Sequence, residues 1–154
     1  MTEKQIAKKL FDKWLRSDVS AHNINFFRFE SDVLALKKSG YMTEYEIKLT
    51  LSDFRADFKK KCRGLSRHEF LEKGFGANRF YYVVPDELIE KIHPMIPEWC
   101  GIISLWHHND DNKLVIHIQK SAKLLHKNTF DDKARMKILT AMYWKAWYQS
   151  WKAL

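Results

Sequence analysis

The chain has 154 residues, of which 45% are hydrophobic and 14% aromatic, and its formal charge at pH 7 is +8. This length suits a single domain with a real core, expected over residues 1–154, and the apolar content excludes an intrinsically disordered chain. The basic charge favours an anionic partner such as nucleic acid, although lysines on solvated helix faces also explain much of it.

No secretion or membrane signal is apparent along the chain. The N-terminal residues alternate charged and apolar side chains, unlike the continuous apolar run of a signal peptide, and no stretch approaches the roughly 20 apolar residues of a membrane span. Cys62 and Cys100 match no zinc-binding spacing. We therefore expect a cytoplasmic protein with reduced thiols and no membrane partner.

The first predicted elements are a helix and a strand. Thr2 is the predicted N-cap of the helix, with Gln5 at the capping-box position three residues later. Apolar residues then recur at helical spacing, so this helix is expected to pack on a sheet; they are Ile6, Leu10, Phe11, Trp14 and Leu15. Residues 23–29, NINFFRF, are predicted as the first strand.

Residues 31–50 predict a β-hairpin whose turn contains Lys-Lys-Ser-Gly. Because side chains alternate along a strand, Glu46 and Lys48 share one face, and the antiparallel turn returns Asp32 to a position opposite them. Neighbouring strands lie roughly 5 Å apart, so the two carboxylates can converge on one hard cation such as Mg²⁺. Glu30 is either a further acid of this pocket or simply a charged strand end.

Residues 53–62 are predicted as a helix capped by Ser52, with acids early and bases late. Its basic end and the glycine-containing loop over residues 63–79 form a candidate surface for a phosphate backbone, with a merely solvated face as the alternative. The candidate nucleic-acid-binding residues are Lys61, Arg63, Arg67 and His68.

The second half of the chain predicts a buried strand over residues 80–84, a short helix over 86–92 and a strand pair over 101–106 and 114–118. The last helix, about residues 131–153, carries an aromatic stripe, interpreted as core or as the face of a homodimer. Together the elements predict an α/β fold with a mixed central β-sheet flanked by helices.

Asp32, followed across a turn by Glu46-Ile47-Lys48, resembles the active-site signature of the PD-(D/E)XK (restriction-endonuclease-like) nuclease superfamily. The helix beginning at Ser52 and the strand over residues 78–85 follow in the order seen in small phage-encoded and DNA-repair-associated members. The resemblance covers about residues 25–105, and Ser31 stands where the superfamily's name has proline.

The resemblance implies a restriction-endonuclease-like core and hydrolysis of DNA phosphodiester bonds with Mg²⁺, for which Mn²⁺ substitutes. It implies Asp32 and Glu46 as metal ligands, joined by the backbone carbonyl of Ile47, and Lys48 as the residue that orients or activates the attacking water. No base-reading motif is visible, so we expect recognition of DNA structure or backbone, in bacterial or phage DNA processing or repair.

Two other classes of function stay open at this point. One is a non-catalytic nucleic-acid-binding or protein-interaction module on the same nuclease-like fold. The other is an inhibitor or assembly protein that uses the tryptophan-rich last helix as its contact surface. A pure binding module should hold DNA equally well with chelator and with Mg²⁺, which separates it from a nuclease. An inhibitor or assembly protein should form a stable oligomer and show no affinity for DNA in a titration.

Overall fold

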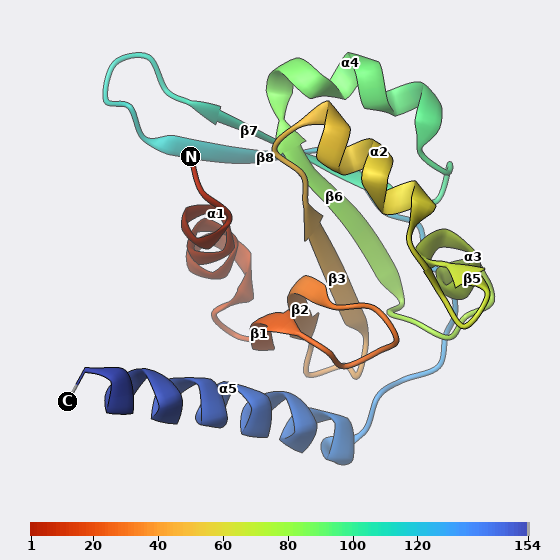
Figure 1. The fold of residues 1–154 in the computed structure, drawn as a ribbon, viewed down its shortest axis with the longest axis vertical. Helices are drawn as coiled ribbons and strands as arrows, with labels where there is room; N and C mark the ends of the chain where they lie inside the picture. The colour runs from red at the N-terminus through yellow and green to blue at the C-terminus, as the bar shows by residue number, and fades with distance from the viewer. Residues whose placement is uncertain (154) are drawn as a thin grey trace.

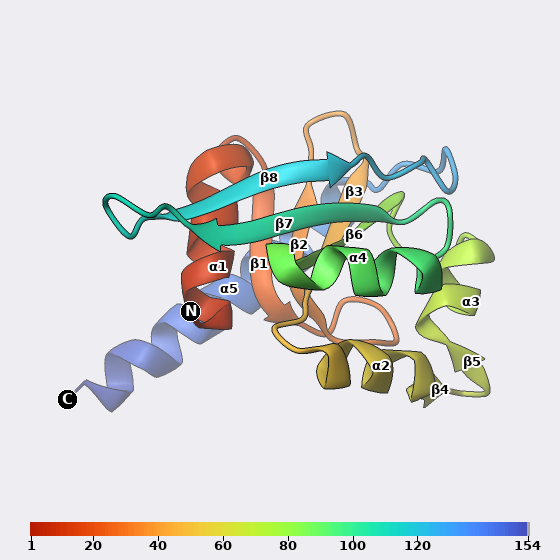
Figure 2. The same cartoon turned by 90° about the horizontal axis from the view of Figure 1, so that it is seen from above.

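A mixed six-stranded sheet, with strand order β1-β2-β3-β6-β7-β8, runs through the molecule and carries helices on both faces (Figures 1 and 2). The computed structural model describes residues 1–153; Leu154, the last residue of the predicted domain, lies outside them. The neighbours β3/β6 and β6/β7 are parallel, and the other pairs are antiparallel. The predicted α/β architecture is therefore confirmed.

The strands of the large sheet are β1 (Val19–Ile24), β2 (Ser31–Leu36), β3 (Met42–Ile47), β6 (Arg79–Pro85), β7 (Gly101–His107) and β8 (Leu114–Lys120). A small ribbon consists of β4 (Lys61–Cys62) and β5 (Leu65–Ser66). The helices are α1 (Glu3–Leu10) with its π-helical continuation η1 (Phe11–Leu15), α2 (Leu51–Lys59), α3 (Arg67–Glu72), α4 (Ile89–Ile92) between the 3-10 turns η2 (Asp86–Leu88) and η3 (His93–Met95), and α5 (Asp132–Lys152).

The predicted hairpin forms from β2 and β3, with Val33 opposite Tyr45 and Leu36 opposite Met42. Gly40 closes the turn with φ +85°, a left-handed conformation that glycine adopts without steric cost. Beyond the hairpin, the strand predicted over residues 80–84 is β6, in the middle of the sheet, and its side chains are buried. The predictions for the hairpin and the central strand are confirmed.

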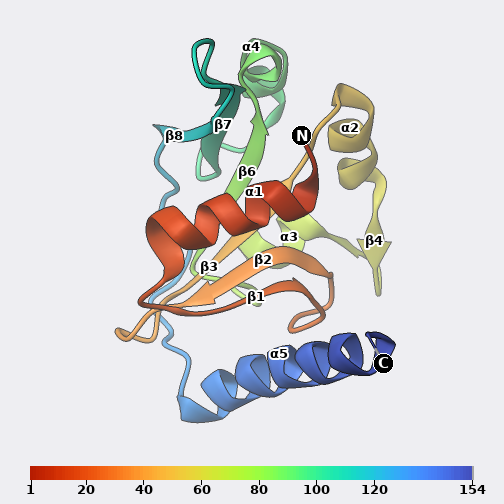
Figure 3. The same ribbon diagram turned by 90° about the vertical axis from the view of Figure 1, so that its left-hand side faces the viewer.

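Each face of the sheet has its own apolar core. One face is covered by α1, which crosses the strands (Figure 3) and buries Ile6 and Leu10 against residues such as Val83 and Ile103. On the other face, α2 and α4 bury Phe54 and Ile92 among alternate residues of β6 and β7. The predicted capping box of the first helix is present, since Thr2 and Gln5 bond each other reciprocally.

The first strand was predicted in the wrong place: it is β1, Val19–Ile24, and not residues 23–29. Asn23 adopts φ +48° within β1, where it has no register partner in β2, and the strand ends at the next residue, Ile24. The phenylalanines that suggested a strand lie in the loop after β1, where Phe26 and Phe27 form edge contacts with Phe130. These phenylalanines therefore pack in an apolar cluster under α5 and do not form one face of a strand.

The second predicted helix is shifted relative to residues 53–62. Its N-cap is Thr50, whose hydroxyl accepts from the backbone N–H of Asp53, so Ser52 lies inside α2. The helix ends at Lys59 because the next residues form β4, which turns through Arg63 and Gly64 into β5. Both turn residues have positive φ, as the two-residue turns of tight hairpins require.

The aromatic stripe of α5 is not core. Of its residues only Ile138 is fully buried, against the β1–β2 side of the sheet. Most of its large apolar side chains are exposed: Met136, Leu139, Tyr143, Trp144, Trp147, Tyr148 and Trp151. Neither α5 nor any other helix within residues 1–153 combines the length and the apolar character needed to cross a membrane.

Ile138→Ala should lower the free energy of unfolding by about 2–4 kcal/mol, because it removes the buried anchor of α5 and leaves a cavity. Leu139→Ala, at the next and half-exposed position, should change it by less than about 1 kcal/mol. Urea denaturation of both variants measures the difference. Equal destabilisation would show that α5 is not anchored through Ile138.

Candidate active site

A polar pocket of about 400 Å³ opens at the end of the β2–β3 hairpin, between the start of α1 and α2. All the sequence-predicted metal and catalytic residues line it, together with the acid Glu30. The full lining is Glu3, Phe29, Glu30, Asp32, Glu46, Ile47, Lys48, Asp53, Ala56, Lys60 and Arg67. The fold thus brings the predicted constellation together in one place.

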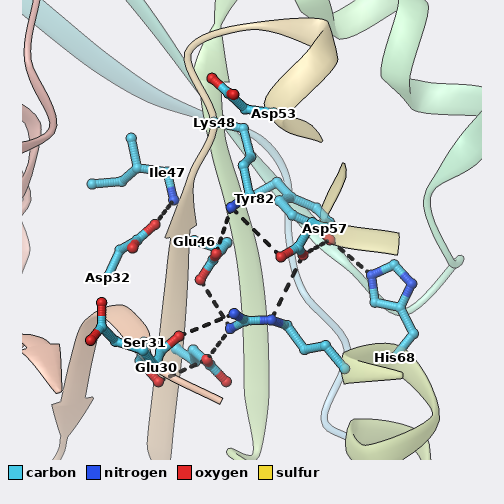
Figure 4. A network of polar contacts seen from close by, with 12 residues as sticks. Glu30, Ser31, Asp32, Glu46, Ile47, Lys48, Asp53, Asp57, His68 and Tyr82 are labelled. Atoms are coloured by element: carbon cyan, nitrogen blue, oxygen red, sulfur yellow. Dashed lines mark hydrogen bonds and ion pairs between the residues drawn. The ribbon is translucent and has the colours of Figure 1, made fainter. Parts of the chain in front are cut away.

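Asp32 continues the β2–β3 pairing with its side chain. The backbone ladder pairs Val33 with Tyr45, and the next inward N–H of β3, that of Ile47, donates to Asp32 Oδ2 at 2.7 Å (Figure 4). The N–H and C=O of one residue in a strand point to the same side. The carbonyl of Ile47 is therefore directed to the side of the strand where Asp32 lies.

Glu46 and Lys48 form a buried ion pair on the same face of β3. Lys48 Nζ donates to Glu46 Oε1 at 2.6 Å. The side chain of Lys48 is 9% exposed and that of Glu46 is 3% exposed. Burial alone would lower the pKa of Lys48, but the carboxylates of Glu46 and Asp57 outweigh it and raise that pKa. Lys48 is therefore an ammonium ion at neutral pH.

The guanidinium of Arg67 joins several elements around the pocket. It lies 2.7 Å from Glu44 Oε1, 2.9 Å from Glu46 Oε2 and 3.7 Å from Asp57 Oδ2. It also donates to the backbone carbonyl of Glu30 at 3.1 Å. Arg67 is the first residue of α3, so this short helix holds a cation against carboxylates of β3 and α2.

A chain of hydrogen bonds extends from the ion network to His68 (Figure 4). Tyr82 donates its hydroxyl to Asp57 Oδ2 at 2.9 Å, and His68 Nε2 lies 2.9 Å from the same hydroxyl. Burial raises the pKa of Tyr82 well above its usual value and lowers the pKa of His68. Since Tyr82 donates to Asp57, it accepts from His68, and the neutral imidazole carries its proton on Nε2.

Carboxylates outnumber cations in this network. Four acids, Asp32, Glu44, Glu46 and Asp57, surround Lys48 and Arg67. Burial raises the pKa of Asp32 and of Glu44, and it raises the pKa of Glu46 to about 7. When all four acids are ionised, they carry more negative charge than Lys48 and Arg67 neutralise, and the raised pKa values reflect the cost of that excess.

The donor set fits a hard divalent cation that keeps several waters. Within residues 1–153, no three His, Cys, Asp or Glu side chains converge as a metal site built only from side chains would require. Glu46 Oε2 is buried and has no hydrogen-bond partner among residues 1–153, although Arg67 Nη1, which donates to Glu44, lies 2.9 Å from it. One or two carboxylates with water and phosphate oxygens are the usual environment of Mg²⁺.

The four predicted nucleic-acid-binding residues fall into two groups. Lys61 and Arg63 are exposed on the β4–β5 ribbon. Arg67 is only 4% exposed and engaged by carboxylates, and His68 is partly buried and bonded to Tyr82. Of these four, only Lys61 and Arg63 lie where an extended phosphate backbone can reach them. Arg67 can contact only a group that enters the pocket.

Sequence reasoning missed Glu44, Asp57, Tyr82 and the helix that carries Arg67. Glu44 lies two residues before Glu46 on the same strand face, and Asp57 lies one turn after the buried Phe54, on the inward side of α2. Ser66 and Glu69 form a capping box, the signal that α3 begins inside the predicted loop. An acid on an apolar helix face is the pattern that would have indicated Asp57.

No protein-family model and no curated protein matches the chain. A solved structure, the SPO1766 protein of unknown function from Silicibacter pomeroyi, is similar with a TM-score of 0.60 and 18% sequence identity. The match covers 97% of this chain and 87% of that chain. At this identity the similarity shows the fold alone.

Stability without metal should fall as pH rises, because a raised carboxyl pKa favours the folded state only while the group is protonated. For Glu46 this contribution is complete below pH 4.5 and is lost as pH rises through about 7. Glu46→Gln removes the titration, so wild type should match the variant at low pH and be less stable by about 3 kcal/mol above neutrality. Urea unfolding in chelator across this range measures the difference, and parallel curves would contradict the burial argument.

Proposed function

We propose that this protein is a Mg²⁺-dependent nuclease that hydrolyses DNA phosphodiester bonds in bacterial or phage DNA processing or repair. The observation that carries the proposal is the convergence of Asp32, Glu46, Ile47 and Lys48 in one polar pocket. This is the residue set that the resemblance to PD-(D/E)XK nucleases implies. Both free cysteines suit the reducing cytoplasm in which such an enzyme would act.

Asp32, Glu46 and the backbone carbonyl of Ile47 are the proposed ligands of Mg²⁺, and Mn²⁺ should substitute. Their oxygens suit a hard cation, and the surplus of carboxylates in the pocket favours its binding. When bound, Mg²⁺ supplies Lewis-acid polarisation of a phosphate and a more acidic water. Glu30, exposed at the rim, is left as a pocket acid without an assigned role.

Lys48 acts in this proposal as a fixed cation and not as a general base. Its raised pKa keeps it protonated, and its contacts with Glu46 and Asp57 hold the ammonium group in place. A preorganised donor of this kind stabilises negative charge that develops on a phosphate and orients a water by hydrogen bonding. Arg67, held behind Glu46, keeps that carboxylate from rotating out of the pocket.

DNA would approach along the surface formed by α2 and the β4–β5 ribbon. Lys60 lines the pocket, and the exposed Lys61 and Arg63 continue the positive charge onto the ribbon. These side chains suit phosphates and carry no base-reading pattern, so recognition of DNA structure or backbone is expected. The overall charge of +8 favours the encounter.

A second candidate function is DNA binding without cleavage. It is favoured by one observation: Glu46 is already paired with Lys48 at 2.6 Å and approached by Arg67 at 2.9 Å, so the carboxylate is partly neutralised by the protein itself. A module of this kind should bind DNA equally well in Mg²⁺ and in chelator. A nuclease should need the metal for cleavage.

Separate replacement of Asp32, Glu46 and Lys48 by Ala should each lower cleavage of DNA at least about 100-fold, because each removes a metal ligand or the fixed cation. Lys38→Ala, an exposed lysine of the hairpin turn, is the matched control and should cleave like wild type. Circular dichroism should show native folding in every protein compared. Undiminished cleavage by all three purified site variants would reject the assignment.

The double variant Lys61→Ala, Arg63→Ala should weaken DNA binding and reduce the dependence of log affinity on log salt by about two, as expected for two lost phosphate contacts. Fluorescence anisotropy of labelled DNA at several salt concentrations, in chelator to prevent cleavage, measures this slope. Lys91→Ala, Lys113→Ala at exposed positions elsewhere is the charge-matched control. An identical slope in both double variants would remove the ribbon from the proposed interface.

A further inference from the structure

The C-terminal half of α5 presents a continuous aromatic face without any partner among residues 1–153. The aromatic face consists of Tyr143, Trp144, Trp147, Tyr148 and Trp151, which are 59%, 51%, 44%, 64% and 61% exposed. Figures 1 and 2 show this end of the helix extending beyond the sheet. Exposed aromatic surface of this extent marks an interaction site in a soluble protein.

We propose that this aromatic face is the interface of a homodimer, in which each copy covers the face of the other. The rings form two rows at i, i+4 spacing along the helix. Tyr143 stacks on Trp147 at 6.3 Å between ring centroids, and Trp151 follows at 5.7 Å. Trp144 and Tyr148 form the second row at 6.5 Å. Such i±4 ridges pack into the grooves between the same ridges of a second helix.

The C-terminal half of α5 has few cations beside the aromatic face, which favours a protein partner over a nucleic acid. Lys145 is rotated by roughly 160° from Trp147 around the helix axis, and Lys152, which follows Tyr148 at i+4, is the lysine at the edge of the face. Lys145 also donates to the backbone carbonyls of His22 and Asn23 in β1. Base stacking by aromatic side chains normally comes with cations beside them that hold the phosphates.

The available area reaches the lower limit for a specific dimer. A large aromatic side chain buries roughly 200 Å² when fully covered, so five that are about half exposed offer roughly 500 Å² per copy. Two copies would bury roughly 1,000 Å², the lower limit for a specific interface. A second copy carries the same face, so a two-fold axis satisfies both helices at once.

Sedimentation velocity from low micromolar to roughly 100 µM protein tests the proposal directly. Wild type should form a species of twice the 18.5 kDa chain mass. Trp147→Glu, in the middle of the face, should weaken association at least roughly 30-fold, as expected for loss of a buried tryptophan contact. Trp151→Glu, nearer the chain end, should do the same with less risk to folding. Gln149→Glu adds the same charge at an exposed position outside the face and should dimerise like wild type.

Wild type that remains a monomer at every concentration would overturn the proposal, as would dimers that persist in both tryptophan variants with native circular dichroism. Vesicles of zwitterionic or anionic lipid and a single-stranded oligonucleotide are added to the same proteins. Monomeric wild type that binds either probe, with binding lost in Trp147→Glu, would assign the aromatic face to that partner instead of a second copy.

Discussion

The guanidinium of Arg67 faces three buried carboxylates, and the arrangement of the polar pocket depends on this convergence. Glu44 and Glu46 reach it from β3 and Asp57 from α2, at distances between 2.7 and 3.7 Å. Removing one partner from a buried ion network leaves an uncompensated charge, so the strand and both helices are coupled through one side chain. The same contacts hold the carboxylate of Glu46 beside Lys48, where the proposed chemistry needs it.

The pocket exists because the β2–β3 ladder ends there. Once the backbone pairing stops after Val33 and Tyr45, the carboxylate of Asp32 takes over the N–H of Ile47. The ladder end therefore brings an acid, a backbone carbonyl and the Glu46–Lys48 pair together without any loop of special conformation. A site held by strands and buried ion pairs is preorganised, which is the main contribution a protein makes to phosphodiester hydrolysis.

Much of this could be predicted from the sequence because it depends on short-range patterns. Alternation along the hairpin predicted that Glu46 and Lys48 share a face, and helical spacing predicted α1 and α5. The predictions failed where tertiary contacts decide which residues are buried. The phenylalanines after β1 pack in a cluster under α5, and the aromatic stripe of α5 is exposed. Arg67 looked like a surface cation, because its three carboxylate partners lie far from it in sequence, up to 23 residues away.

The nuclease assignment is tested most directly by incubating wild-type protein and Lys48→Ala with linear, single-stranded, flapped and four-way DNAs, in Mg²⁺, Mn²⁺ or chelator. We predict cleavage by wild type in either metal, none in chelator and none by the variant. The shape of the DNA that is cut identifies the substrate class. Binding of these DNAs without cleavage under any of the three conditions would contradict the nuclease assignment and leave DNA binding as the function of the pocket.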